Sequence, residues 1–232
     1  MYKLACCTAK KIDDNEIIID TKVVAQNSIE RKYIDHPWWV IGSAAFLFNV
    51  EGKECVAVVQ RTHSVTDPCR WALIPAGVAD CVCELRHPGE LIIREANEEL
   101  KICHNGEWVS LFHVSKLISE NEVSIYDEFT EETYKEIGEV FTHEKKAYFL
   151  RIYRIKDDLG DFFLYDGEKD EEGVNYLDRV IALVPIENLH GIVLPLKMYQ
   201  GQEEIKPREI GLTKHETPTL KWFRKQALHS PG

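Results

Sequence analysis

The chain has 232 residues, 44% of them hydrophobic, a size and composition that suit one globular domain with a full apolar core. Its formal net charge of -11 at pH 7 argues against binding nucleic acid through phosphate neutralisation, although a small nucleotide stays open as a ligand. No apolar run approaches the length of about 18 residues that a membrane-spanning helix needs, so we expect no membrane partner.

The seven cysteines are scattered along the chain in no paired pattern. The first residues, from Met1 to Lys11, lack the apolar stretch of a signal peptide. Disulfides are rare in the cytoplasm, where thiols are kept reduced. We therefore expect a cytoplasmic protein with reduced cysteines.

Runs rich in β-branched and aromatic residues predict a set of strands around a central helix. The predicted strands are residues 17–19, 23–24, 38–49, 55–62, 71–74, 108–118, 147–155 and 180–184. Glu51-Gly52-Lys53 predicts a hairpin turn, and Pro75-Ala76-Gly77 predicts a turn after the strand that precedes it. Helices are predicted at 88–100 and 219–228, and the acidic stretch 157–173 predicts a solvated loop.

Three parts are expected along the chain. Residues 1–35 form an N-terminal extension of β-structure, residues 36–200 form the main domain, and residues 201–232 form a C-terminal tail with a helix. No internal repeat or low-complexity tract divides the sequence further.

The most informative segment reads Arg94-Glu95-Ala96-Asn97-Glu98-Glu99-Leu100. Glu95 lies three and four residues before Glu98 and Glu99, so the three carboxylates share one face of a helix. Like charges at this spacing repel each other, and a bound cation relieves the repulsion. Oxygen-only ligands favour a hard cation, Mg²⁺ or Mn²⁺, over zinc. Apolar residues at helical spacing give the helix a buried side, namely Ile92, Ile93, Ala96 and Leu100.

This segment resembles the Nudix box, the signature of the Nudix hydrolase family. The signature reads Gly, five residues, Glu, seven residues, and then Arg-Glu-apolar-any-Glu-Glu-any-Gly-apolar. The second half matches the chain from Arg94 to Ile102, except that Lys101 stands where the signature has Gly.

The first half of the box is re-gapped. Twelve residues instead of five separate Gly77 from Glu90, and three instead of seven separate Glu90 from Arg94. The loss of four residues removes about one helical turn, so the phase of the helix is nearly kept. Glu84 is the alternative first glutamate, and we prefer Glu90 because it follows Gly89 directly.

The resemblance implies an α/β fold, the Nudix α/β/α sandwich with a mixed β-sheet, here with an N-terminal β extension. It implies hydrolysis, dependent on Mg²⁺ or Mn²⁺, of the pyrophosphate bond in a nucleoside diphosphate linked to another moiety. Pro75-Ala76-Gly77 and the N-terminal extension resemble the branch that acts on ADP-ribose and nucleotide sugars. That branch tends to dimerise through the extension, so a homodimer is expected.

The resemblance also implies roles for single residues. The expected metal ligands are Glu90, Glu95, Glu98 and Glu99. Arg94 and Glu98 are expected to take part in catalysis, with Arg94 orienting the carboxylates by pairing with Glu98 or Glu90. The general base is expected on the loop 142–146 ahead of a strand, as Glu144 or else His143. The residues expected near the substrate are Arg61, Ala76 and Gly77.

Several alternatives stay open. Trp38, Trp39 and Trp108 could stack on a nucleobase, although aromatic residues in strands more often belong to a core. A zinc site is a weaker possibility, drawn from Cys69, Cys81, Cys83, His87, Cys103 and His104. At the level of function, the rivals are a non-catalytic Nudix domain that senses a ligand or binds a partner, and a hydrolase of dinucleotides, caps or nucleoside triphosphates.

Overall fold

The protein is described from a computed structural model. The structure describes residues 6–13, 16–20, 38–61, 70–81, 83–84, 87–104, 106–111, 123–136, 139–155, 162–167, 179–212 and 216–229. The strands of the central sheet are β1 (Cys6–Asp13), β2 (Glu16–Asp20), β3 (Trp38–Val50), β4 (Lys53–Gln60), β5 (Trp71–Leu73), β6 (Ala76–Val78), β9 (Val123–Glu136), β10 (Glu139–Arg154), β12 (Val180–Pro185), β14 (Lys197–Gln200) and β15 (Glu203–Ile205). The other elements are α3 (Pro88–Glu99), β7 (Leu100–His104), β8 (Glu107–Ser110), β11 (Leu164–Asp166), the 3₁₀ helix η2 (Ile186–Asn188), β13 (Ile192–Val193), β16 (Ile210–Gly211) and α4 (Pro218–His229).

The central sheet has eleven strands, and its main path runs β15-β14-β12-β4-β3-β1-β2. Strands β5 and β6 pair with β4 and β3, and β10 pairs with both β3 and β9. Among the described strand pairs, β10 with β3 is parallel, in register from Lys145 opposite Trp38 to Arg154 opposite Leu47, and the rest are antiparallel. Two smaller sheets, β11-β7-β8 and β13-β16, lie outside this path.

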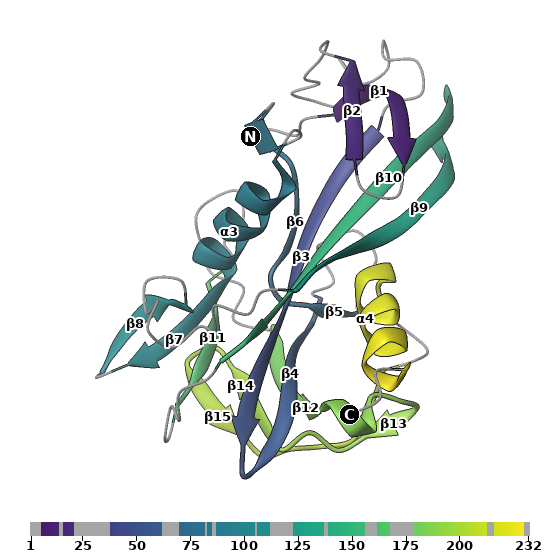
Figure 1. The fold of residues 1–232 in the computed structure, drawn as a ribbon. Helices are drawn as coiled ribbons and strands as arrows, with labels where there is room; N and C mark the ends of the chain where they lie inside the picture. Colours follow the sequence, from purple (N-terminus) through teal and green to yellow (C-terminus); the bar gives the residue numbers. More distant parts are fainter. Residues whose placement is uncertain are drawn as a thin grey trace.

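Helices α3 and α4 cover opposite faces of the central sheet (Figure 1). Alternate residues of β3 point to the two faces, as the period of a strand requires. Ala44 and Phe46 belong to the apolar cluster that includes Ile92 and Ala96 of α3. The neighbouring residues Ala45 and Leu47 belong instead to the cluster that includes Leu220 and Phe223 of α4. The predicted α/β sandwich with a mixed sheet is therefore confirmed.

The predicted hairpin is formed by β3 and β4. Glu51 and Gly52 have φ values of 53° and 78°, and positive φ at both central positions is typical of a type I′ turn.

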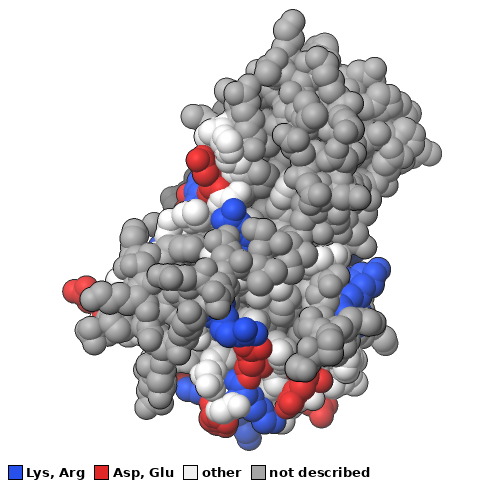
Figure 2. All heavy atoms as spheres, viewed as in Figure 1, with Lys and Arg blue, Asp and Glu red and all other residues white. Residues whose placement is uncertain are grey.

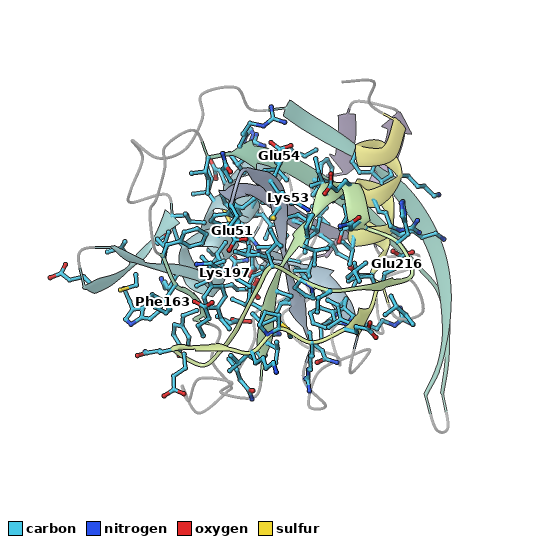
Figure 3. The ribbon with its side chains drawn as sticks, turned by 90° about the horizontal axis from the view of Figure 1, so that it is seen from below. Glu51, Lys53, Glu54, Phe163, Lys197 and Glu216 are labelled. Atoms are coloured by element: carbon cyan, nitrogen blue, oxygen red, sulfur yellow. A yellow bond between two sulfur atoms is a disulfide. The ribbon has the colours of Figure 1, made fainter. Side chains whose placement is uncertain are left out.

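Charged side chains gather at this end of the sheet, as Figure 3 shows for Glu51, Lys53 and Glu54. Lys53 Nζ lies 3.2 Å from Glu187 Oε1, and Arg154 pairs with Glu54. On the face drawn in Figure 2, basic and acidic atoms likewise lie intermingled at the lower end. Such exposed pairs contribute little to stability, so the informative charges are the buried ones.

Two predicted boundaries need correction. Ala76 and Gly77, predicted as a turn, form the strand β6, because they pair with Ser43 and Gly42 of β3. The segment 142–146, predicted as a loop, lies inside β10, which begins at Glu139. Pairing with β9 along its length and with β3 from Lys145 onward extends this strand beyond its apolar core.

The predicted solvated loop at 157–173 is wrong where the structure describes it, at residues 162–167. Phe162 is buried, and Leu164 to Asp166 form the buried strand β11, which pairs with β7. Apolar side chains in an otherwise acidic stretch are the physical reason, because burying them favours a strand against the core.

The remaining predicted elements hold with shifted ends. Helix α4 covers the predicted 219–228, and β12 covers 180–184. The predicted strand at 23–24 and residues 112–118 of another lie outside the described residues. No helix in the described part of the chain combines the length and apolar character that a membrane crossing needs.

Candidate functional site

Helix α3 carries the candidate site because its sequence gives it one apolar and one acidic side. Pro88 stands in the first turn, where its missing N–H removes no helical hydrogen bond. Leu91 and Ile92 are buried against the sheet. Glu90 is exposed in the first turn, where a negative charge suits the helix dipole.

Glu95 and Glu99 are both buried, with 8% and 7% of their surface exposed. Glu99 Oε2 accepts a hydrogen bond of 2.9 Å from the backbone N–H of Ala76 on β6. A Cβ atom at Gly77, the next residue of β6, would overlap the Glu95 carboxylate. Strand β6 thus holds one carboxylate with an N–H group and makes room for the other with a glycine. The structure brings together Glu95, Glu99, Ala76 and Gly77, which the sequence proposed for one site.

Arg94 connects the buried carboxylate of Glu95 to the exposed one of Glu98. Its Nη1 atom lies 2.8 Å from Glu95 Oε1 and donates a hydrogen bond of 3.2 Å to Glu98 Oε2. The Glu98 side chain is 59% exposed, so it lies at the solvent side of the group. The predicted pairing of Arg94 with Glu98 is confirmed, and Arg94 joins two of the three box carboxylates, Glu95 and Glu98.

Glu84 is the strongest partner of Arg94. Its two carboxylate oxygens accept hydrogen bonds of 2.6 and 3.1 Å from Nε and Nη2 of Arg94. The backbone N–H of Asp80 donates to Glu84 Oε2 at 2.9 Å. Glu84, the alternative first glutamate, therefore pairs with Arg94, and among the described residues Arg94 makes no contact with Glu90. A role for Glu90 in metal binding stays a prediction.

A further carboxylate, Asp166, was missed because it lies in the stretch predicted as a loop. It follows Leu164 and Tyr165 on β11 and pairs in register with Leu100, the residue after Glu99. Asp166 is 4% exposed and accepts a hydrogen bond of 2.8 Å from Nη1 of Arg179, which is 6% exposed. The signal that could have revealed it is the apolar run Phe162-Phe163-Leu164-Tyr165, which predicts a strand that ends at an acid.

Burial governs the electrostatics of this group. It raises the pKa of Glu95 to about 7 against the opposing charge of Arg94. Burial, followed by the charges of Glu95 and Asp166, raises the pKa of Glu99 well above its usual value. Burial also raises the pKa of Asp166 to about 6, although Arg179 opposes it. For Glu84, burial is outweighed by the hydrogen bonds from Arg94 and Asp80, and its pKa is lowered.

Among the described residues, the interactions of this group join more carboxylates than guanidiniums. Two guanidiniums, those of Arg94 and Arg179, face the carboxylates of Glu84, Glu95, Glu98, Glu99 and Asp166. Buried carboxylates either keep a proton or need a cation. The donors are all oxygen atoms, the set that Mg²⁺ and Mn²⁺ prefer. Glu95 and Glu99 therefore offer the kind of ligand that a hard divalent cation takes, although among the described residues Glu95, Glu98 and Glu99 do not form a group whose ligand atoms lie within 4.8 Å of one another.

Lys101, which stands where the signature has glycine, contacts the last turn of α3. Its Nζ atom donates a hydrogen bond to the backbone oxygen of Asn97 in the last turn of α3. A cation at this position suits the carbonyl end of a helix. The departure from the motif therefore serves as a helix cap.

The other predicted residues lie on separate elements. Arg61 follows β4, and its backbone N–H donates to the carbonyl of Arg70 at 2.9 Å. Trp108 on β8 is half-buried and packs against Tyr165, with ring centroids 5.6 Å apart. The side chains of Trp38, Trp39, His143 and Glu144 lie outside the described part of the structure.

The cysteines differ in part from the prediction of reduced thiols. Cys81 and Cys83 form a disulfide, because the loop brings their Cα atoms to 5.5 Å, within the range that disulfides need. This removes one support for the predicted cytoplasmic location. Cys55 and Cys103 are free, and burial raises the pKa of Cys55 to about 12, which keeps its thiol unreactive.

The zinc alternative gains nothing from the described residues. Ligand atoms of Asp80, Cys81 and Glu84 lie within 4.8 Å of one another. The sulfur of Cys81 is held in the disulfide, however, and both oxygens of Glu84 bind Arg94. The side chains of Cys69 and His104 lie outside the described part of the structure.

Comparisons with known proteins add a weak likeness. No family model and no curated protein matches the chain. Among solved structures, the chain is similar to a MutT/nudix family protein from Enterococcus faecalis, with a TM-score of 0.31 and 14% sequence identity. The match covers 80% of this chain and 59% of that structure. A likeness at this level carries no argument about activity, which has to come from the site.

Proposed function

We propose that the protein is a divalent-metal-dependent pyrophosphate hydrolase of the Nudix type. The observation that carries the proposal is the pair of buried carboxylates, Glu95 and Glu99, that α3 presses against β6. Two buried acids four residues apart oppose folding unless a cation or protons neutralise them. A bound divalent cation would neutralise both carboxylates, and this is why we propose that the protein uses one.

The chain's own residues have distinct tasks in this proposal. Glu95 and Glu99 would hold Mg²⁺ or Mn²⁺, with Glu98 reaching it from the solvent side. When bound, such a cation neutralises pyrophosphate charge and lowers the pKa of a water molecule. Arg94, clasped by Glu84, keeps the carboxylates of Glu95 and Glu98 in place.

The proposed substrate class is a nucleoside diphosphate linked to another moiety, as in ADP-ribose or a nucleotide sugar. Its cleavage would give a nucleoside monophosphate and a phosphorylated remainder. Support for this class comes from Pro75-Ala76-Gly77 and the β-structure at the N-terminus. A homodimer and the role of Glu144 as general base belong to the same proposal.

The test is metal-dependent hydrolysis over a panel of nucleotides. The panel contains ADP-ribose, nucleotide sugars, NADH, dinucleoside polyphosphates and nucleoside triphosphates, each with Mg²⁺ or Mn²⁺. Glu99→Gln should lower kcat/KM by roughly 1000-fold, since metal stabilisation of the transition state amounts to several kcal/mol. Glu203→Gln, which alters an exposed carboxylate on β15, is the matched control.

The outcomes separate the proposal from its rivals. Turnover of one substrate class that depends on metal and on Glu99 supports the enzyme and names its substrate. No turnover on any panel member, combined with nucleotide binding that Glu99→Gln leaves unchanged, contradicts it and favours the ligand sensor.

A further inference from the structure

The buried pair of Asp166 and Arg179 adjoins the candidate metal site from outside the motif. Strand β11 reaches the end of α3 because Asp166 pairs in register with Leu100 and the N–H of Gly167 donates to the backbone oxygen of Glu99. Arg179, the residue before β12, places Nη1 at 2.8 Å from Asp166 Oδ2. Segments distant in the sequence thus bring Asp166, with Arg179 bound to it, next to the backbone at the end of α3.

The charges of Asp166 and Arg179 both act on the Glu99 carboxylate, in opposite directions. A guanidinium binds carboxylates strongly, often through two parallel hydrogen bonds. An Arg179 that lacked Asp166 would therefore be attracted to Glu99. It would also place a positive charge beside the carboxylates that are proposed to bind a cation, where the two cations would repel each other.

We propose that Asp166 is a positioning residue, which holds Arg179 by its guanidinium and so leaves the Glu99 carboxylate available to a divalent cation. The inference rests on the proposed function, since it concerns the same site. Asp166 acts through Arg179 and Glu99 and touches neither substrate nor reacting atoms. Residues that orient metal-binding carboxylates in this way typically change metal affinity by about 10-fold to 100-fold when mutated.

A second acid–arginine pair in the chain provides a matched control. Glu216 accepts hydrogen bonds of 2.8 and 3.0 Å from Arg224, and its side chain is largely buried. Figure 3 shows Glu216 beside α4, on the opposite side of the molecule from Phe163, which directly precedes β11. Neutralising either acid removes one partner of an arginine, but Asp166 alone adjoins Glu99.

The test is isothermal titration of the full chain with Mn²⁺ in the absence of nucleotide. Asp166→Asn should weaken Mn²⁺ binding by about 10-fold or more. Adding Arg179→Met to that variant removes the guanidinium that Asp166 no longer balances and should restore affinity to within about threefold of the parent. Glu216→Gln should leave Mn²⁺ affinity unchanged, since its pair lies away from the site.

Recovery in the double variant is the decisive readout, because a general loss of packing would not be reversed by a second substitution. If Asp166→Asn fails to fold, the Mn²⁺ affinity of the double variant is the test. Weak Mn²⁺ binding by the double variant then overturns the proposal. Unchanged affinity in folded Asp166→Asn also overturns it.

Glu99→Gln, titrated under the same conditions, separates this inference from the proposed function. If Glu99→Gln weakens binding and Asp166→Asn does not, only this inference fails. Equal Mn²⁺ binding by the parent and Glu99→Gln contradicts the proposed function as well.

Discussion

The two faces of the central sheet are each covered by a helix of twelve residues, but the two helices bury different chemistry. Helix α4 packs Leu220 and Phe223 into an apolar cluster. Helix α3 packs Ile92 and Ala96 in the same manner, yet it also buries Glu95 and Glu99 beside β6.

The comparison teaches that a helix can cover a face of this sheet without burying acids of its own. A helix of equal length covers the other face with apolar residues and two buried threonines, Thr217 at its edge and Thr219 within it. The charged pair near α4 balances one carboxylate, Glu216, with one guanidinium, Arg224. Among the described residues, Arg94 of α3 instead contacts three carboxylates, Glu84, Glu95 and Glu98, and this difference is what the proposed cation site would explain.

The largest expected effect on stability comes from removing the guanidinium of Arg94, which forms ion pairs with several carboxylates. Arg94→Met leaves the buried Glu84 without its bidentate partner and lets Glu95 and Glu98 repel each other. The free energy of unfolding, measured with urea in EDTA, should fall by about 3 kcal/mol. Arg224→Met deprives Glu216 alone and should cause a smaller loss. An equal or larger loss in Arg224→Met would remove the contrast between the two faces.

A pH dependence should follow from the raised pKa values of Glu95, Glu99 and Asp166. The native state of the metal-free protein holds more protons than the unfolded chain between an ordinary carboxyl pKa, near 4, and about 7. Stability is therefore present at low pH and is lost as the pH rises through this window. The melting temperature in EDTA should fall by on the order of 5 °C. Glu95→Gln should flatten the slope, and a stability that rises with pH would contradict the assignment.

A smaller effect is expected from the glycine that makes room for Glu95. Gly77→Ala places a Cβ atom in the space of the Glu95 carboxylate, which then has to move. Mn²⁺ affinity should drop by about tenfold. Gly211→Ala is the control, because a Cβ atom there meets no atom within 4 Å. Equal affinities in the two variants would show that the position of Glu95 does not matter for the cation.

The sequence predicted the α3 face better than its surroundings. Helical spacing and the acidic run sufficed to predict α3, because both signals are local. The prediction was wrong for Ile93, which was expected on the buried side of the helix and is 39% exposed. The choice between Glu84 and Glu90 depended on which acid folds back onto Arg94, and only the tertiary contact decides this. Asp166 was missed because it reaches Glu99 through the pairing of β11 with β7, across a large separation in the chain.

The fold likewise has features that local sequence predicts and features that only distant contacts determine. The β3–β4 hairpin was predictable from Glu51-Gly52 between two apolar runs. The parallel pairing of β10 with β3 was not, since no local pattern specifies a partner so far away. That pairing also carries the strand through residues 142–146, where charged residues suggested a loop.

The central proposal is that Glu95 and Glu99 hold a divalent cation. The most direct test is the melting temperature at pH 8 with EDTA or Mn²⁺, for the parent and for Glu99→Gln. We predict that Mn²⁺ stabilises the parent by about 2.7 kcal/mol at a hundredfold excess over its Kd, and that Glu99→Gln loses this response but is the more stable protein in EDTA. The account would be contradicted if Mn²⁺ left the melting temperature of the parent unchanged and Glu99→Gln melted at a lower temperature than the parent in EDTA.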